Sequence, residues 1–474
     1  MNEQNQTSAS VPRKPESRKR CFPVLRCAVF LAVLAAVVIG LQSVFIMDLD
    51  RGYDHIANFY DEKPGTMDVI MVGASEVNAT WQPPIGWREY GIAVWDFAID
   101  TLPPRAVRIM IDEARKRQPQ AVVLISLNPF KLELDKYSVD KIHRAVDFLP
   151  LCKTKIDLVN AMTGKYYSLS EKLEFLFPII RFHSRWDSLK GPAFGEKHED
   201  FKGAMRTVTF RQKIYSVAGT YHVSYEESEA PDEVKATMIE LLDYLDRNGV
   251  RATFVKFPQD LDDDQLGRMN QIQKIAEERG YPVLDLLEMA EELNIDFGND
   301  FYNARHLNIH GSLKAMEEIA SYLKDTYGLG NRQVQAQQSE DPQTRKQWES
   351  WDTAADNYLA YIRPYVLPFE LEHPDRAALS APKLKKASAK GRAITVSWNE
   401  SDGADGYAVY RSAGKKWEYA GETDYTALEY TDTGLKPSTK YTYRVVPFRY
   451  GLVDGEKQYG HFDAAGISAK TAKK

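Results

Sequence analysis

Two separated stretches of the sequence carry residue types that nucleophilic catalysis uses. Gly73-Ala-Ser75 directly follows the apolar run 68–72, and the second stretch, Asp300-Phe-Tyr-Asn303-Ala-Arg-His306, comes much later in the chain. A serine hydroxyl is a weak nucleophile until an adjacent imidazole accepts its proton. A Gly-Ala-Ser turn alone is common, and a lone histidine is often structural. The presence of both stretches makes Ser75 and His306 the candidates for chemistry.

The residues between these stretches predict the scaffold that would bring them together. Residues 66–325 alternate between apolar runs and amphipathic stretches, which is typical of a parallel sheet with helices on both faces, an α/β three-layer sandwich. The predicted strands are 68–72, 121–126, 253–257 and 283–285, and the predicted helices are 105–117, 233–247, 263–279 and 312–324. Ser75 then lies at the carboxyl end of the first strand, where such sheets bind ligands, and a histidine shortly before the last helix can reach it.

Two other stretches depart from this alternation. Residues 130–229 are rich in aromatic residues and lack clear periodicity, so we expect a cap inserted into an α/β domain that spans 66–330. Residues 331–344 have the polar composition of a linker, and we assign 331–380 to this linker and one packing helix. The aromatic residues of that helix are expected to be packing residues: Trp348, Trp351, Tyr358 and Tyr361.

The N-terminal segment predicts a membrane anchor. Residues 1–26 contain six basic and two acidic residues, and residues 27–47 contain no charged residue. A helix of that length spans a bilayer core, and the basic flank places the N-terminus in the cytoplasm. We therefore expect a single-pass protein of the cell membrane with everything beyond the anchor outside the cytoplasm. A cleaved signal peptide is the alternative.

The C-terminal residues 381–474 show a second architecture, with short alternating strands separated by turn residues. Trp398, Tyr407 and the stretch from Leu435 to Tyr441 resemble a fibronectin type III domain. The resemblance implies an all-β sandwich in which Trp398 is buried and Tyr441 forms the tyrosine corner. In bacteria such modules are common in exported proteins as spacers or adhesive units, so this one supports an outside location.

The two stretches with Ser75 and His306 resemble the SGNH (GDSL-like) hydrolases, whose fold is flavodoxin-like, and in particular a membrane-tethered group of Gram-positive bacteria. The resemblance implies that Ser75 is the nucleophile and His306 the general base. The family has Asp where this chain has Asn303, and Asp300 is the alternative orienting group. For the oxyanion hole it implies the backbone N–H of Ser75 and two further donors, for which Ala98 and Asn128 are the nearest candidates.

These observations lead to two hypotheses. The first is a membrane-anchored, extracytoplasmic SGNH-like esterase or O-acyltransferase acting on acyl groups of cell-envelope polysaccharide. The second is a catalytically silent SGNH-like scaffold that binds an acylated glycan or a partner membrane acyltransferase; a pure adhesin would leave the paired motifs unexplained. We expect no cofactor and no metal, because metal and nucleotide motifs have no support in the sequence. A net charge of −6 gives no basic footprint for nucleic acid.

Overall fold

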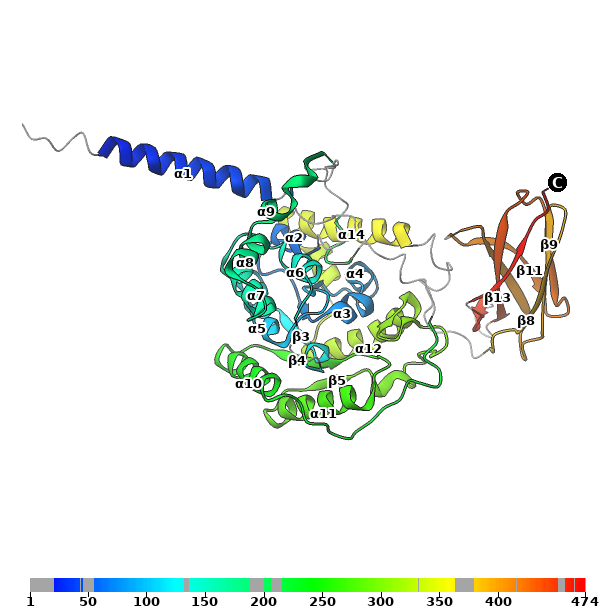
Figure 1. The fold of residues 1–474 in the computed structure, drawn as a ribbon. Coiled ribbons are helices and arrows are strands. Elements are labelled where there is room, and N and C mark those ends of the chain that lie inside the picture. The colour runs from blue at the N-terminus through cyan, green and yellow to red at the C-terminus, as the bar shows by residue number, and fades with distance from the viewer. Residues whose placement is uncertain are drawn as a thin grey trace, which may run out of the picture.

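Three structural units follow one another along the chain: an apolar helix, an α/β region and a β sandwich (Figure 1). They are seen in a computed structural model. It describes residues 21–42, 44–45, 55–131, 136–187, 200–205, 215–330, 332–362, 379–414, 416–450, 457–463 and 465–473. Most of the basic tail, residues 1–20, and parts of the expected cap lie outside the described residues.

The N-terminal helix α1 (Cys21–Gln42) contains the apolar segment Val24–Leu41, whose mean hydropathy is 2.7. None of that segment is buried inside the protein. Its length and composition suffice to cross a membrane, and a signal sequence satisfies the same criteria. The helix begins before the uncharged run 27–47 and includes its residues 27–42.

The α/β region is built on a parallel sheet of five strands, with every pair of neighbours parallel. The strands are β1 (Val69–Val72), β2 (Val94–Asp96), β3 (Val122–Ser126), β4 (Ala252–Lys256) and β5 (Val283–Asp285). Their order, β2-β1-β3-β4-β5, reverses direction at β1, which places a crevice at the carboxyl ends of β1 and β3. The sequence predicted β1, β3, β4 and β5; β2 is three residues long and gave no periodic signal.

Helices cover both faces of this sheet, as its alternating buried side chains require. Ile70, Val123 and Phe254 pack with helices α5 (Pro104–Arg117), α10 (Asp232–Arg247) and α11 (Asp263–Glu278). Val69 and Leu124 point to the opposite face, which is covered by three other helices. These are α3 (Ser75–Thr80), α4 (Pro83–Tyr90) and α12 (Ile309–Tyr327). The predicted parallel three-layer architecture is therefore present.

The first part of the segment expected to be an inserted cap, residues 136–187, is largely helical, whereas its described residues 200–205 and 215–229 contain no helix. The segment contains η4 (Asn128–Lys131), α6 (Val139–Val146), α7 (Lys153–Thr163), α8 (Leu169–Leu176), α9 (Pro178–Phe182) and η5 (His183–Asp187). Helix α7 packs against α5 of the sheet domain. The helices are short, and α8 and α9 each bury a single residue, which explains why the sequence showed little clean periodicity there.

The stretch interpreted as a linker is helical, which corrects that prediction. Helix α13 (Arg332–Gln338) is followed by α14 (Pro342–Ile362), which packs on α4. Trp348 stacks on Trp87 with ring centroids 4.9 Å apart. Polar residues of α13 bond to other parts of the protein. The Arg332 guanidinium, for example, pairs with the buried Asp68 carboxylate. Polar composition here reflects ion pairing, and the expected packing role of the tryptophans is confirmed.

The C-terminal unit is an antiparallel sandwich of two sheets. One sheet contains β8 (Leu384–Lys390), β9 (Ala393–Trp398) and β12 (Glu429–Asp432). The other contains β10 (Gly406–Ser412), β11 (Glu418–Asp424), β13 (Lys440–Tyr450), β14 (Lys457–Tyr459) and β15 (Ile467–Lys470). Trp398 is fully buried, and the Tyr441 hydroxyl accepts a hydrogen bond from the Lys436 N–H at 3.1 Å. This is the tyrosine corner that the sequence predicted.

Candidate functional site

Ser75 is the first residue of α3 and follows the turn Gly73-Ala74 after β1, at the carboxyl edge of the sheet. Gly73 allows this turn to pack closely against the neighbouring strand. A Cβ atom on Gly73 would lie 2.6 Å from the Cβ of Ser126 and 2.6 Å from a methyl group of Val77. Ser75 itself is half-buried, so its hydroxyl remains accessible at the carboxyl edge of the sheet.

His306 comes from a small hairpin that precedes α12. Its strands are β6 (Phe301–Asn303) and β7 (His306–Leu307), and Asn303 pairs directly with His306. The Asn308 side chain caps α12 by accepting from the His310 and Gly311 N–H groups. This arrangement fixes the hairpin to the first turn of a long buried helix.

The hairpin places His306 directly against Ser75. The Ser75 Oγ lies 2.7 Å from the His306 Nε2, and the His306 Nδ1 lies 2.8 Å from the Asn303 Oδ1. The two residues named first from the sequence are therefore within hydrogen-bond distance, although 231 positions separate them.

The tautomer of His306 follows from a further bond to Asn303. The Arg305 backbone N–H donates to the same Asn303 oxygen at 2.8 Å, so that atom is the carbonyl oxygen and acts only as an acceptor. His306 must then carry its proton on Nδ1, which leaves Nε2 to accept the Ser75 hydroxyl proton. Asn303 thus holds the imidazole in the tautomer that a general base needs, without supplying a negative charge.

Tyr302 is a neighbour of the imidazole that the sequence analysis did not single out. Its ring stacks on His306 with centroids 5.0 Å apart and an interplanar angle of 12°. The stacked ring limits tilting of the imidazole, and its electron-rich face favours a positively charged partner. The sequence offered one signal for this role: Tyr302 is an aromatic residue directly before Asn303 in a short strand.

Asp300, the alternative orienting group, has other partners. Its carboxylate is fully buried, pairs with the Lys314 Nζ at 2.7 Å and accepts the Asp296 N–H at 2.8 Å. The geometry therefore gives the orienting position to Asn303 and places Asp300 in a buried ion pair below the hairpin.

Replacing Asp300 with asparagine is expected to lower the stability of the α/β domain by about 1.5–3 kcal/mol, because the Lys314 ammonium loses its charged partner. Thermal unfolding of the full chain would measure this loss. If Asp300 instead acted on His306, the variant would lose turnover at unchanged stability and shift its pH–rate profile.

Glu76, directly after the candidate nucleophile, organises the adjoining strand ends. Its buried carboxylate accepts from the Ala74 N–H at 2.9 Å, the Ser126 hydroxyl at 2.6 Å and the Asn128 side-chain amide at 2.6 Å. Asn128, the candidate oxyanion donor, therefore has one amide N–H bonded to Glu76. Ala98 follows β2, and its carbonyl accepts from the buried His55 and Asn78 side chains. Sequence reasoning missed Glu76, although a carboxylate next to a candidate nucleophile was the available signal.

Lys131 lies in the same short turn as Asn128. It is 3% exposed, and its ammonium nitrogen donates to Gln259 Oε1, in the loop after β4. Burial lowers the pKa of Lys131 to about 7, and the nearby Glu76 carboxylate opposes this shift. The edge of the sheet that carries Ser75 therefore contains a buried amine able to titrate near neutral pH.

This lowered pKa predicts a dependence of stability on pH. Between about pH 7 and pH 10 the unfolded chain holds a proton on Lys131 that the folded chain lacks, so stability rises with pH in that window. Lys131→Met should remove this rise. At pH 6 its free energy of unfolding should exceed that of the parent by about 1 kcal/mol or more, so it should unfold at a higher urea concentration. Urea titrations of both chains at pH 6 and pH 9 would measure it; equal pH dependence of the two would contradict the assignment.

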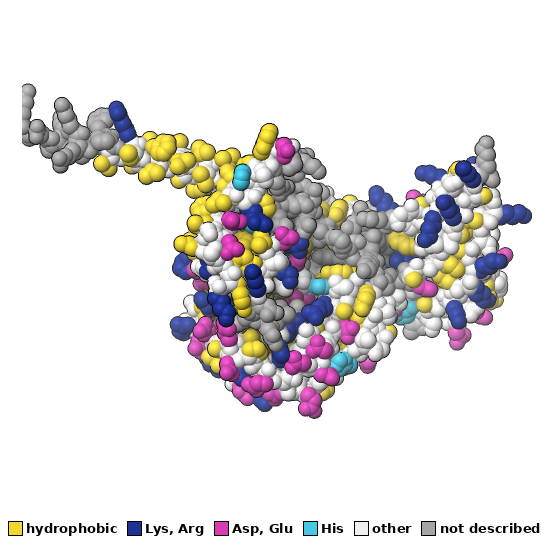
Figure 2. Space-filling model, in the orientation of Figure 1, with side chains coloured by type: hydrophobic (Ala, Val, Ile, Leu, Met, Phe, Trp, Pro, Cys, Tyr) yellow, Lys and Arg dark blue, Asp and Glu magenta, His cyan; other side chains and the backbone are white. Residues whose placement is uncertain are grey.

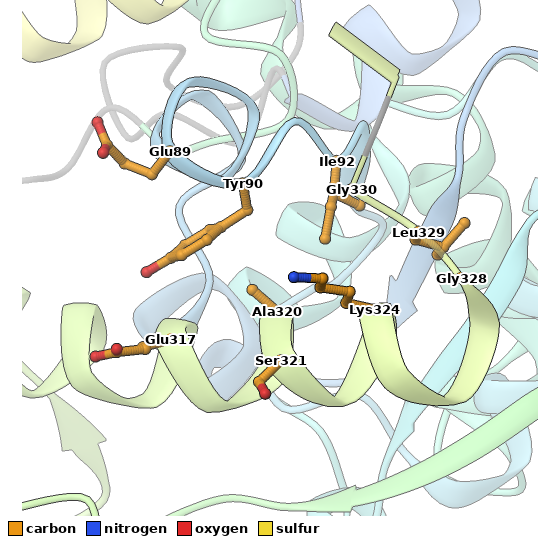
Figure 3. A pocket seen from close by; sticks show the side chains of 10 residues that line it. All are labelled: Glu89, Tyr90, Ile92, Glu317, Ala320, Ser321, Lys324, Gly328, Leu329 and Gly330. Atoms are coloured by element: carbon orange, nitrogen blue, oxygen red, sulfur yellow. The ribbon is translucent and has the colours of Figure 1, made fainter. Parts of the chain in front are cut away.

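Other parts of the described chain offer less chemistry. An open cavity of about 630 Å³ lies between α4 and α12 and includes Tyr90, Ile92 and Lys324 (Figure 3). Ile92 precedes β2, so this cavity is at the amino edge of the sheet, opposite to Ser75. Among the described residues no group of three His, Cys, Asp or Glu side chains is placed to hold a metal ion.

Comparisons with known proteins concern only part of the chain. No protein-family model matches it. Exoglucanase B of Cellulomonas fimi is 38% identical over 98 residues, which are 19% of this chain and 8% of that protein. The chain thus matches less than a tenth of that curated relative.

Solved structures show the same limited coverage. A β-1,2-glucanase from Parabacteroides distasonis is 25% identical over 21% of this chain and 13% of that chain, with a TM-score of 0.17. An Fn3-like protein from Clostridium thermocellum is 29% identical over 18% of this chain and 88% of its own, with a TM-score of 0.15. FN3tt is 22% identical over 20% of this chain and 99% of its own, with a TM-score of 0.17. These matches carry no further conclusion; the two antiparallel sheets, the buried Trp398 and the tyrosine corner are what make the C-terminal sandwich fibronectin type III-like.

Proposed function

We propose that the protein is an extracytoplasmic esterase or O-acyltransferase of the SGNH type that acts on acyl groups of cell-envelope polysaccharide. The observation that carries the proposal is the chain of contacts from Ser75 through His306 to Asn303. It supplies a nucleophile, a base in the required tautomer and a group that orients the base. The position of this chain at the carboxyl edge of a 2-1-3-4-5 parallel sheet supports it further.

The proposed reaction begins with the Ser75 hydroxyl. Its oxygen attacks the acyl carbonyl carbon while its proton passes to the His306 Nε2. The backbone N–H of Ser75 and the second amide N–H of Asn128 would bind the oxygen that becomes negative. Collapse of the tetrahedral intermediate breaks the ester bond, and His306 returns the proton to the departing sugar oxygen. Water or a second sugar hydroxyl then attacks the acyl-serine and gives its proton to His306. The bond to the Ser75 oxygen breaks, and His306 returns the proton to that oxygen, which completes hydrolysis or transfer.

The location and the substrate class rest on the flanking units. In the proposal, α1 anchors the protein with its N-terminus in the cytoplasm, because basic residues precede the apolar segment. The fibronectin type III-like sandwich is in keeping with an exported protein. The partial similarity to Exoglucanase B is in keeping with a glycan as the substrate. A membrane acyltransferase that supplies acyl groups would be a natural partner on the same surface.

A fluorophosphonate probe tests the nucleophile. The full chain in detergent micelles should be labelled at Ser75, as located by mass spectrometry of the labelled peptide. The Ser75→Ala variant should not be labelled, and His306→Ala should be labelled much more slowly because the hydroxyl loses its base. Absence of labelling in the folded parent would overturn the proposed esterase.

The presence of Asn303 in place of a carboxylate favours a second candidate function. A neutral orienting group cannot stabilise the imidazolium that forms when His306 takes the proton. The buried Glu76 carboxylate beside Ser75 adds negative charge near the place where an oxyanion would develop. In this alternative the domain is a catalytically silent scaffold that binds an acylated glycan or a partner acyltransferase.

A further inference from the structure

Six exposed leucine, isoleucine and tryptophan side chains of the cap lie between residues 151 and 186. Outside α1, every exposed leucine among the described residues lies in the cap, and exposed isoleucine and tryptophan side chains accompany them. We call this set the apolar cap surface: Leu151, Ile156, Leu169, Leu173, Ile180 and Trp186. Leu169 and Trp186 are 76% and 73% exposed, so these side chains pack against little of the protein. Apolar exposure of this density indicates an interaction surface.

The apolar cap surface adjoins the end of the apolar helix α1. Helix α1 contacts α9, which carries Ile180. A cavity of about 430 Å³ is lined by Ile39 of α1 together with Leu149, Leu151 and Leu176 of the cap. In Figure 1, α8 and α9 lie on the side of the domain from which α1 projects. Figure 2 shows hydrophobic side chains that continue from α1 onto this adjoining surface.

The charges of this region do not indicate a polyanionic partner. Lys153 pairs with Asp157, and Arg181 pairs with Glu174 at 3.3 Å, so basic and acidic groups alternate along the helices. Leu169 and Leu173 are four residues apart on α8 and therefore share one helical face. A short amphipathic helix with an exposed aliphatic face and nearby tryptophan is typical of an element that lies in a membrane interface.

We propose that the apolar cap surface rests in the outer interface of the bilayer that α1 crosses, with Leu169, Ile180 and Trp186 among the acyl chains and headgroups. The inference uses the proposed role of α1 as an anchor and is independent of the proposed esterase. It gives the cap a function: it fixes the tilt of the domain and holds the Ser75 edge of the sheet at a constant height above the membrane.

Site-specific fluorescence of the full chain in proteoliposomes tests this placement. Cys21, Cys27 and Cys152 are first replaced with serine. Single cysteines are then introduced by Leu169→Cys, Ile180→Cys, Ile239→Cys and Val33→Cys and labelled with a polarity-sensitive dye. Ile239 on α10 is the matched control, because it is an isoleucine 44% exposed, against 48% for Ile180, and lies outside the cap. Val33 reports on α1 itself.

Phospholipids with brominated acyl chains should quench the dye at 169 and 180 several-fold more strongly than at 239. The quenching should be similar in neutral and anionic lipid, because burial of apolar groups drives the contact. Quenching at 169 and 180 no greater than at 239 would overturn the proposal, as would a blue-shifted but unquenched dye, which would indicate contact with a second copy. Quenching at Val33 decides separately whether α1 is in the bilayer, so failure of the anchor and failure of the surface are distinguishable.

Discussion

Replacement of Ser75 with alanine is expected to lower turnover of an acylated glycan by about 10³-fold or more; removal of the catalytic serine from a serine protease with a complete triad lowers kcat by about 10⁶-fold. The structure gives the reason, because the Ser75 Oγ is the atom that faces the His306 Nε2 at 2.7 Å. With alanine at this position no acyl-enzyme can form. Binding of the glycan should change little, since the hydroxyl contributes mainly in the transition state.

The measurement is release of the acyl group from cell-wall polysaccharide by the full chain in micelles, with kcat and KM determined separately. Ser321→Ala is the matched control, because Ser321 is an exposed serine on α12 beside the cavity at the opposite edge of the sheet. Loss of kcat in Ser75→Ala at unchanged KM and unchanged thermal stability supports the nucleophile. Equal turnover in Ser75→Ala and its parent would remove Ser75 from the mechanism.

Long buried elements of the fold could be predicted from the sequence because their patterns repeat. Helices α10 and α11 and strands β1, β3 and β4 lie within one or two residues of their predicted ranges. Strand β2 could not be predicted, because three residues between loops carry no periodicity. Helix α13 could not be predicted either, because its polar side chains, among them Arg332, bond to partners such as Asp68 that are distant in sequence. Composition cannot reveal a partner of that kind.

Some residues of the candidate site could likewise be predicted from the sequence, and others required the structure. Ser75 and His306 could be named from the sequence because each lies in a short motif of typical composition, and the hairpin brings them together. The choice between Asn303 and Asp300 required the structure, since it depends on which side chain faces Nδ1 and which one faces Lys314. Tyr302 and Glu76 required it too, because stacking and buried hydrogen bonds depend on side-chain directions that spacing alone does not give.

Asn303 determines how strongly the site can act. In a serine-protease triad a carboxylate-to-amide change lowers turnover by about 10⁴-fold, partly because the amide selects the wrong imidazole tautomer. That part of the loss is absent here, since the Arg305 N–H fixes the Asn303 oxygen toward His306. What Asn303 lacks is the negative charge that would stabilise the imidazolium during proton transfer. Restoring a carboxylate should therefore recover part of that loss of about 10⁴-fold.

The variant Asn303→Asp is expected to raise kcat about 10²-fold and to move the acidic limb of the pH–rate profile to higher pH, because the added carboxylate stabilises protonated His306. The pH–rate profile of the full chain, with an acylated glycan as substrate, provides the measurement. Asn294→Asp is the control, since Asn294 is an exposed asparagine in the segment that precedes the hairpin. A rise in activity from a measurable parental level supports an enzyme with a weakened triad. Zero activity in both parent and variant would instead favour the binding scaffold, with Ser75 and His306 retained as a ligand contact.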